Sequence, residues 1–172
     1  LGSKAYVKAH ADELKDCVAM LNFDVAAPTL GSNHLVTLAT DDALHYVAGV
    51  LREAGYGVRA KQDTYSSDCI PFADNGVPAI NLARFGANGA DYMHNRHDSL
   101  KSGYLDEHAL DITLQQGFVL LTRLANAASF PIKRAIATEI RQKVHEYLFK
   151  TKKESSPDDR TFRADSQRPA AS

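Results

Sequence analysis

The chain has 172 residues, 44% of them hydrophobic and 24% charged, and its formal net charge is -1. This length suits a single domain, and the apolar fraction is sufficient for a folded core. The near-neutral charge does not support nucleic-acid binding, and no apolar run approaches the roughly 20 residues that span a bilayer. Two cysteines, Cys17 and Cys69, are too few for a disulfide scaffold, and we expect free thiols.

The first half of the chain alternates between helix and strand patterns. Ser3 can cap a first helix that places Val7, Ala11 and Leu14 on one face. The next run is continuously apolar and predicts a strand that is buried on both faces and stops at Asp24. The elements expected here are a helix over 4–15, strands over 18–23 and 34–39, a helix over 42–54 and a strand over 58–62.

The second half begins with a polar, turn-rich segment over 63–76 and a buried strand over 77–82. A long loop over 84–99 is rich in Gly, Asn, His and Asp, and loops of this length usually carry function. Helices are expected over 107–125 and over 131–150, where Pro131 can begin the helix. The tail over 152–172 is rich in Ser, Asp, Arg, Pro and Ala, and we expect it to be disordered.

The alternation of strands and helices favours an α/β fold, with three layers and helices on both faces of a mostly parallel, mixed sheet. Ligands of such sheets bind beyond the carboxyl ends of the strands. Asp24 lies at one predicted strand end, and His94 lies in the loop that follows another.

Several local patterns occur in a fixed order along the chain. Gly2-Ser3 opens a helix, and Leu21-Asn22-Phe23-Asp24 ends a strand in an acid. The third pattern is Ser67-Asp68, then Phe72, then Gly76-Val77-Pro78-Ala79, and the fourth is His94 followed by Asp98-Ser99. Together these patterns resemble metallopeptidase family 28, the zinc aminopeptidases with a co-catalytic metal pair. The resemblance runs from Leu1 to about Ala127. Each short motif would be weak evidence for the family by itself.

The resemblance implies a role for individual residues. Asp24 and His94 would be zinc ligands in a site for two ions, and the substrate would be a peptide. Carboxylate oxygen and imidazole nitrogen are both common zinc ligands. Asp68 would orient a ligand or the loop, whereas Asp98 would stabilise the loop. Tyr65 and Tyr92 are candidates to donate a hydrogen bond to the tetrahedral oxyanion.

The sequence departs from the family pattern in several places. The family's other ligands and its general-base Glu would all lie before Leu1, so the resemblance implies an incomplete catalytic domain that lacks its first strands and is inactive by itself. Cys69 stands where the family has His, and Asn95 stands where it has Thr. Val25-Ala26-Ala27 stands where Gly is common, so the turn after Asp24 is expected to differ.

Several alternatives remain open at this stage. The chain would divide into the C-terminal part of a peptidase domain (1–127), a C-terminal helix (128–151) and the tail (152–172). The rivals to a peptidase are a non-catalytic binding or assembly module and a glutaminyl-cyclotransferase-like enzyme with one zinc. Oligomeric state, side-chain preference and compartment stay open; many relatives are exported, although this chain carries no signal peptide.

Overall fold

The structure is a computed structural model that describes residues 2–86 and 93–153 of the chain. Its centre is a four-stranded sheet in the order β1-β4-β2-β3. The strands are β1 (Met20–Asp24), β2 (Ser32–Leu38), β3 (Arg59–Gln62) and β4 (Ala79–Phe85). β1 pairs with β4 in parallel and β2 pairs with β3 in parallel, whereas β2 and β4 are antiparallel. The prediction of a mostly parallel, mixed sheet is therefore confirmed.

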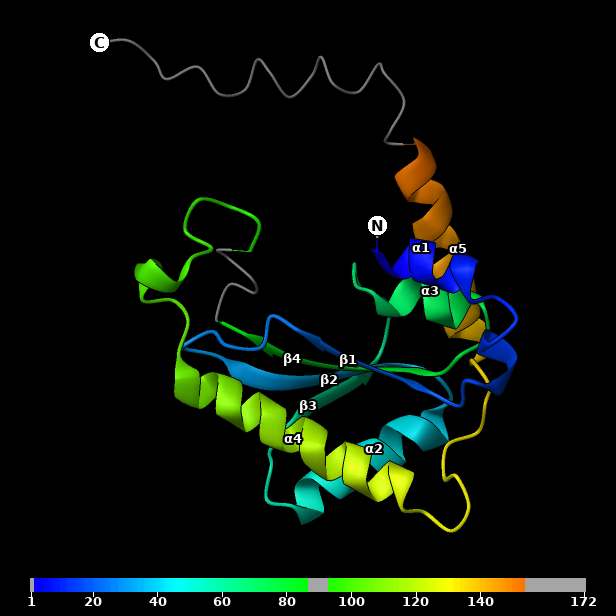
Figure 1. The fold of residues 1–172 in the computed structure, drawn as a ribbon, viewed down its shortest axis with the longest axis horizontal. Helices are drawn as coiled ribbons and strands as arrows, with labels where there is room; N and C mark the ends of the chain where they lie inside the picture. The colour runs from blue at the N-terminus through cyan, green and yellow to red at the C-terminus, as the bar shows by residue number, and fades with distance from the viewer. Residues whose placement is uncertain (1, 87–92, 154–172) are drawn as a thin grey trace.

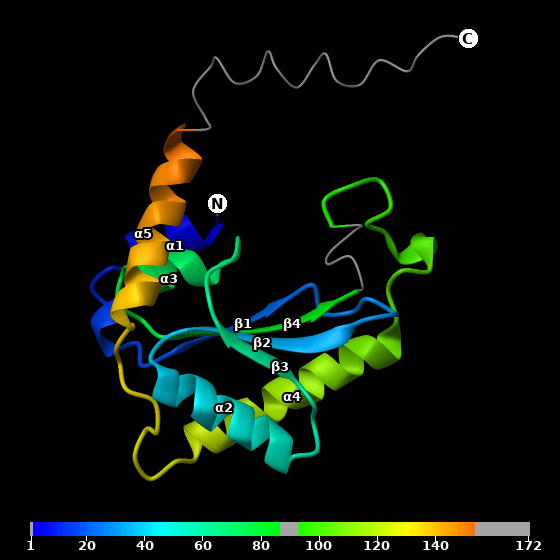
Figure 2. The ribbon, with the colours of Figure 1, turned by 180° about the vertical axis from the view of Figure 1, so that it is seen from behind.

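Helices cover both faces of this sheet, which gives the three layers expected (Figure 1). α2 (Asp41–Glu53) and α4 (Glu107–Ala125) lie side by side against one face. α3 (Cys69–Asp74) packs on the other face, and α1 (Gly2–Ala9) and α5 (Thr138–Lys153) pack on α3 (Figure 2). These three helices gather over one end of the sheet, away from the loop over 93–99 (Figure 1).

The side chains of β1 show how the two faces are divided. Leu21 packs into the apolar cluster shared with α2 and α4, whereas Met20 packs into the cluster shared with α3 and α5. Neighbouring residues in a strand point to opposite faces, so Asn22 and Asp24 follow Met20 to the α3 side. The candidate ligand Asp24 therefore ends β1 on the face that α1, α3 and α5 cover only at one end.

The first helix is shorter than the prediction over 4–15. α1 ends at Ala9, and a separate 3-10 turn, η1 (Leu14–Asp16), follows it. The break places Leu14 in a small cluster with Val7 and Val77. Arg134 fixes the turn, because its guanidinium donates to the carbonyl oxygens of Leu14 at 2.7 Å and Cys17 at 3.0 Å.

The last helix begins later than the prediction from Pro131. Ile132 is buried in the cluster on the α2 and α4 side, and Ile136 is buried in the cluster on the α3 side. The segment between them crosses from one face of the sheet to the other, which a continuous helix would not allow. The N–H of Ala137 then donates to the carbonyl oxygen of Ala39, the residue after β2, at 3.2 Å, and α5 begins at Thr138.

Two further differences lie between β3 and the long loop. α3 forms inside the segment predicted as a turn-rich connection, and it buries Cys69, Ile70, Pro71 and Ala73. Pro71 is tolerated because it lies in the first turn, where a backbone N–H has no intrahelical partner. β4 continues to Phe85, beyond the predicted end at residue 82, because it pairs along the full length of β2.

The remaining expectations on organisation are met in part. α2, β3 and α4 lie close to their predicted positions. No helix within the described ranges is both long and apolar enough to span a membrane. The predicted tail begins inside α5, and residues 154–172 lie outside the described residues. The division into 1–127, 128–151 and 152–172 stays a prediction.

Candidate metal centre

Asp24 is the last residue of β1, and the turn after it is unusual. Val25 adopts a positive φ of 49°, a region that β-branched residues rarely occupy. The carbonyl oxygen of Val25 accepts a hydrogen bond from the backbone N–H of Arg84 at 3.1 Å, which holds this turn against β4. The turn therefore has a backbone conformation that favours Gly, although the residue is Val.

The carboxylate of Asp24 is held by a tyrosine from the segment after β3. The hydroxyl of Tyr65 donates to Oδ2 of Asp24 at 3.1 Å, and its ring lies edge-on to Phe85. Burial raises the pKa of the Tyr65 hydroxyl well above its ordinary value, and the charge of Asp24 raises it further. The phenol therefore stays protonated and keeps donating. This contact fits an orienting role, while the oxyanion role of Tyr65 stays a prediction.

A pair of asparagine side chains joins β1 to β4. Asn22 of β1 and Asn81 of β4 are partners in the parallel register. The side-chain N–H of Asn22 donates to Oδ1 of Asn81 at 2.6 Å, and Asn81 is fully buried. No motif in the sequence points to this pair, although each Asn interrupts an apolar run. Its hydrogen bond ties the strand that ends in Asp24 to the centre of the sheet.

The second candidate ligand lies in the loop that the sequence predicted. His94 has a positive φ of 63°, and its backbone N–H donates to Oδ2 of Asp98 at 3.1 Å. This bond is the kind of contact expected of a residue that stabilises the loop. His97 is exposed and accepts from Nε of Arg96 at 3.2 Å. Tyr92, the other oxyanion candidate, lies outside the described residues.

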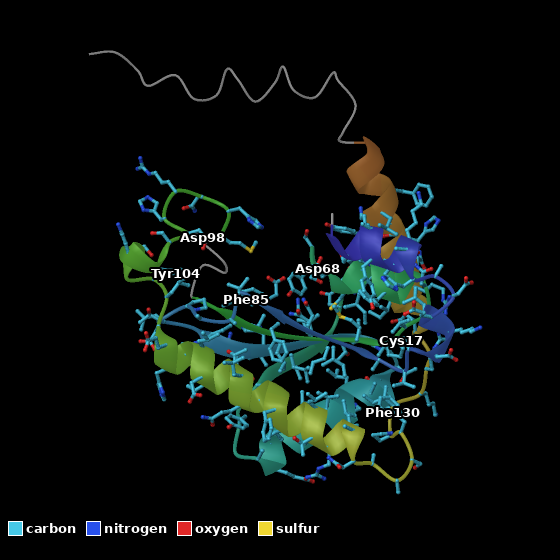
Figure 3. All side chains as sticks on the ribbon, in the orientation of Figure 1. Cys17, Asp68, Phe85, Asp98, Tyr104 and Phe130 are labelled. Atoms are coloured by element: carbon cyan, nitrogen blue, oxygen red, sulfur yellow. The ribbon has the colours of Figure 1, made fainter. Side chains whose placement is uncertain are left out.

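Asp24 and His94 meet in the lining of two neighbouring cavities. One has a volume of about 460 Å³ and is also lined by Asp68, Ser67 and Tyr147. The other has a volume of about 320 Å³ and is also lined by Asp98 and Tyr104. Figure 3 shows Asp68 on the side of α3 and Asp98 and Tyr104 on the opposite side, beyond the uncovered part of the sheet. The structure thus brings the two candidate ligands to one place.

Asp68 contributes a second carboxylate to the larger cavity. It stands at the N-cap position of α3, but its side chain accepts no capping hydrogen bond, and it is exposed. The next residue, Cys69, is buried, and burial raises the pKa of its thiol to about 12. Cys69 is therefore a protonated core residue at neutral pH, and Asp68 is the polar group that α3 presents to the cavity.

The donor set fits zinc in part. Asp24 offers carboxylate oxygen and His94 offers imidazole nitrogen, and catalytic zinc typically takes three protein ligands of these kinds. Within the described part of the chain, no group of three or more His, Cys, Asp and Glu is placed to hold an ion. Asp24 and His94 would therefore be two of the ligands of such a site.

The match to a known family decides the identity. The model of Peptidase family M28 matches residues 1–116, which is more than half of the chain. The chain belongs to peptidase family M28. The match covers Asp24, Asp68 and His94, so all three lie within the part that this M28 chain shares with its family.

The fold of this M28 chain is similar to that of solved zinc aminopeptidase structures. BSAP, a zinc aminopeptidase from Bacillus subtilis, superposes with a TM-score of 0.58 at 18% identity, over 79% of this chain and 36% of BSAP. A medium-resolution crystal structure of BSAP gives 0.55 at 19% identity, with the same coverage. The chain thus spans about a third of the length of the structures it matches. No curated protein sequence matches it significantly.

Proposed function

We propose that this chain supplies part of the active site of a zinc-dependent aminopeptidase. The observation that carries the proposal is that Asp24 and His94, which come from β1 and a distant loop, line the same two cavities. Membership of family M28 makes peptide-bond hydrolysis the reaction that this arrangement fits best. The expectations of two zinc ions and of removal of N-terminal residues rest on the family resemblance.

Four residues of the chain would have separate tasks in that site. Asp24 and His94 would hold the metal, and Tyr65 would fix the orientation of Asp24 by donating to Oδ2, which leaves Oδ1 for the metal. Asp98 would hold the backbone of His94 in place. Zinc, when bound, acts as a Lewis acid toward the peptide carbonyl and lowers the pKa of water.

We further propose that the site is completed by polypeptide beyond the described residues. The described residues hold no third ligand in place, and the chain covers 36% of BSAP. A general base and additional acidic or imidazole ligands would have to be supplied by such a segment. By itself the 172-residue chain is then expected to bind zinc weakly and to lack peptidase activity.

The test compares three single variants of the full-length protein that the gene encodes. Asp24→Asn and His94→Gln should each weaken zinc binding by about 100-fold or more, because losing even a supporting residue typically costs 10–100-fold in metal affinity. Zinc affinity by competition with a chelator and hydrolysis of an aminoacyl substrate are the two readouts. His97→Gln is the matched control, because this exposed imidazole in the same loop should leave both unchanged. Unchanged zinc affinity in both Asp24→Asn and His94→Gln would refute the ligand assignment.

A further inference from the structure

The residue that holds the carboxylate of Asp24, Tyr65, lies in a short connection outside the helices and strands. Residues 63–68 join the end of β3 at Gln62 to the start of α3 at Cys69. Such a connection has no ladder of backbone hydrogen bonds to fix it, so its position depends on contacts with neighbouring elements. The hydrogen bond from Tyr65 to Oδ2 of Asp24 therefore needs another element to hold the connection in place.

Two side chains of α5 contact this connection on either side of Tyr65. Nζ of Lys143 lies 2.9 Å from Oδ1 of Asp63, which precedes Tyr65 in the connection. The hydroxyl of Tyr147 donates to Oγ of Ser66, the residue directly after Tyr65, at 2.8 Å. Lys143 and Tyr147 lie one turn apart, on the same face of α5. The helix therefore holds the connection at two points, with Tyr65 between them.

Of the two contacts, the one from Tyr147 is better suited to fix a position. Lys143 is 49% exposed and Asp63 is 34% exposed, and ion pairs of this kind contribute little in water. The ring of Tyr147 instead packs against the apolar cluster that α3 and α5 share, so its hydroxyl has a defined place. Tyr147 also lines the cavity of about 460 Å³ in which Asp24 and His94 meet.

We propose that Tyr147 is a positioning residue of the candidate metal centre. Through its hydrogen bond to Ser66 it holds Tyr65 in place, and Tyr65 in turn orients the carboxylate of Asp24. α5 lies wholly beyond residues 1–116, which match the family, so family membership does not assign this role. The inference rests on the proposed function, because orienting Asp24 affects zinc binding only if Asp24 is a ligand.

The distance of each residue from the metal sets the size of the expected effects. Tyr65 contacts the ligand itself, and the loss of such a partner typically weakens metal binding by about 10–100-fold. Tyr147 acts one residue further away, through a single hydrogen bond, whose net contribution corresponds to at most about a tenfold change in an equilibrium constant. Losing the Tyr147 hydroxyl should therefore weaken zinc binding by about three- to tenfold.

The test measures the zinc affinity of the full-length protein that the gene encodes, by competition with a chelator. Tyr147→Phe and Ser66→Ala each remove one partner of the hydrogen bond, and each should raise the Kd for zinc by about three- to tenfold. Tyr147→Phe keeps the ring in its apolar cluster, so the fold is retained. Tyr56→Phe is the matched control, because the hydroxyl of Tyr56 also donates to a side-chain oxygen, Oε1 of Gln115, at 2.8 Å. Tyr56 packs against the cluster on the α2 and α4 side, and its loss of a hydroxyl should leave the Kd unchanged.

A second measurement distinguishes positioning from a general effect on folding. Tyr147→Phe is introduced into the Tyr65→Phe variant, in which the hydroxyl that contacts Asp24 is already absent. If Tyr147 acts through Tyr65, the additional change should leave the zinc affinity of this variant unaltered. A residue that only supports the fold would instead weaken zinc binding by the same factor with or without the Tyr65 hydroxyl.

The outcomes separate this inference from the proposed function. Weaker zinc binding in Tyr147→Phe, with no further loss in the Tyr65→Phe variant, supports the inference. Unchanged affinity in Tyr147→Phe, together with weakened affinity in Asp24→Asn, overturns the inference and leaves the proposed function standing. An equal loss with and without the Tyr65 hydroxyl also overturns it. Unchanged affinity in both Asp24→Asn and His94→Gln refutes the proposed function, and the inference fails with it.

Discussion

At the scale of single residues, the candidate site is notable for its backbone. Val25 and His94 have positive φ angles of 49° and 63°, and no other non-Gly residue in the described ranges does. One follows the candidate ligand Asp24 and the other is the candidate ligand itself. Such conformations cost free energy and tend to occur at functional sites, because surrounding contacts must enforce them. The strain therefore lies where the proposed chemistry would need fixed geometry.

Val25→Gly should raise the free energy of unfolding of the chain. Removing the Cβ relieves the left-handed strain, which costs about 1–3 kcal/mol, while the greater freedom of Gly in the unfolded chain returns about 0.4–1 kcal/mol. We expect a net gain of about 1 kcal/mol in urea unfolding. Val25→Ala is the control, because Ala removes the branched side chain but keeps the steric cost of positive φ. An equal gain in both variants would show that the φ angle is not the cause.

The sequence could predict which residues to consider as candidates for the site, but not the contacts around them. Asp24, Asp68 and His94 were found because each lies in a recognisable pattern, and the structure places all three around one cavity. The pairing of Asn22 with Asn81 depends on the register of two strands that are far apart in the chain. The hydrogen bond from Tyr65 to Asp24 likewise depends on the path of the chain after β3. Neither contact has a local signal.

At the scale of elements, α5 supports the segment between β3 and α3. Nζ of Lys143 lies 2.9 Å from Oδ1 of Asp63, which also accepts from the backbone N–H of Thr64. The hydroxyl of Tyr147 donates to Oγ of Ser66 at 2.8 Å. This segment carries Tyr65, so a helix that lies beyond the matched residues 1–116 helps to position the candidate site.

The bond between Asp63 and Lys143 makes part of the stability depend on pH. Lys143, and to a smaller extent the N–H of Thr64 and Lys61, lowers the pKa of Asp63 from 3.8 to about 2. Because the folded pKa lies below the unfolded one, the stabilisation is complete above about pH 4 and is lost as the pH falls toward 2. Asp63 is 34% exposed, so water screens the pair, and we expect about 1 kcal/mol or less.

Urea unfolding of Asp63→Asn, Lys143→Gln and the double variant at several pH values measures this contribution. The coupling between the two residues should be present at pH 7, decline below about pH 4 and weaken in 1 M salt. A coupling that persists at pH 2 would mean that the carboxylate charge is not its source.

The predicted boundaries of an element match the observed ones where its packing and its local sequence preference agree. α4 was predicted at its observed bounds, because its start is capped by Asp106, whose carboxylate accepts from the N–H of Ala109 at 2.9 Å. α3 and the start of α5 were missed for different reasons. α3 is too short for its periodicity to register, and residues 131–137 are kept out of the helix by burial of Ile132 and Ile136 on opposite faces.

At the scale of the whole molecule, the alternation of strands and helices along the chain predicted the fold class but not the strand order. The order β1-β4-β2-β3 places β4 between two strands that precede it in the chain, and β4 pairs in parallel with β1 and antiparallel with β2. β1 is left at an edge as a result. The edge position of β1 therefore comes from topology, and the exposure of Leu114, Phe118 and Leu121 on α4 could not be read from the helix pattern.

Two neighbouring leucines of α4 test which face of the helix packs on the sheet. Leu120 is fully buried against the sheet, whereas the next residue, Leu121, is 59% exposed. Leu120→Ala should lower the free energy of unfolding of the 172-residue chain by about 3 kcal/mol, since buried Leu→Ala changes cost about 2–5 kcal/mol. Leu121→Ala should change it by about 0.5 kcal/mol or less.

Leu120 and Leu121 differ in what surrounds their side chains. Leu120 belongs to the apolar cluster that α4 shares with α2 and the sheet. Leu120→Ala therefore leaves a cavity in the core, whereas more than half of the Leu121 side chain is already in water. Equal costs for the two substitutions in the 172-residue chain would mean that α4 presents a different face to the sheet.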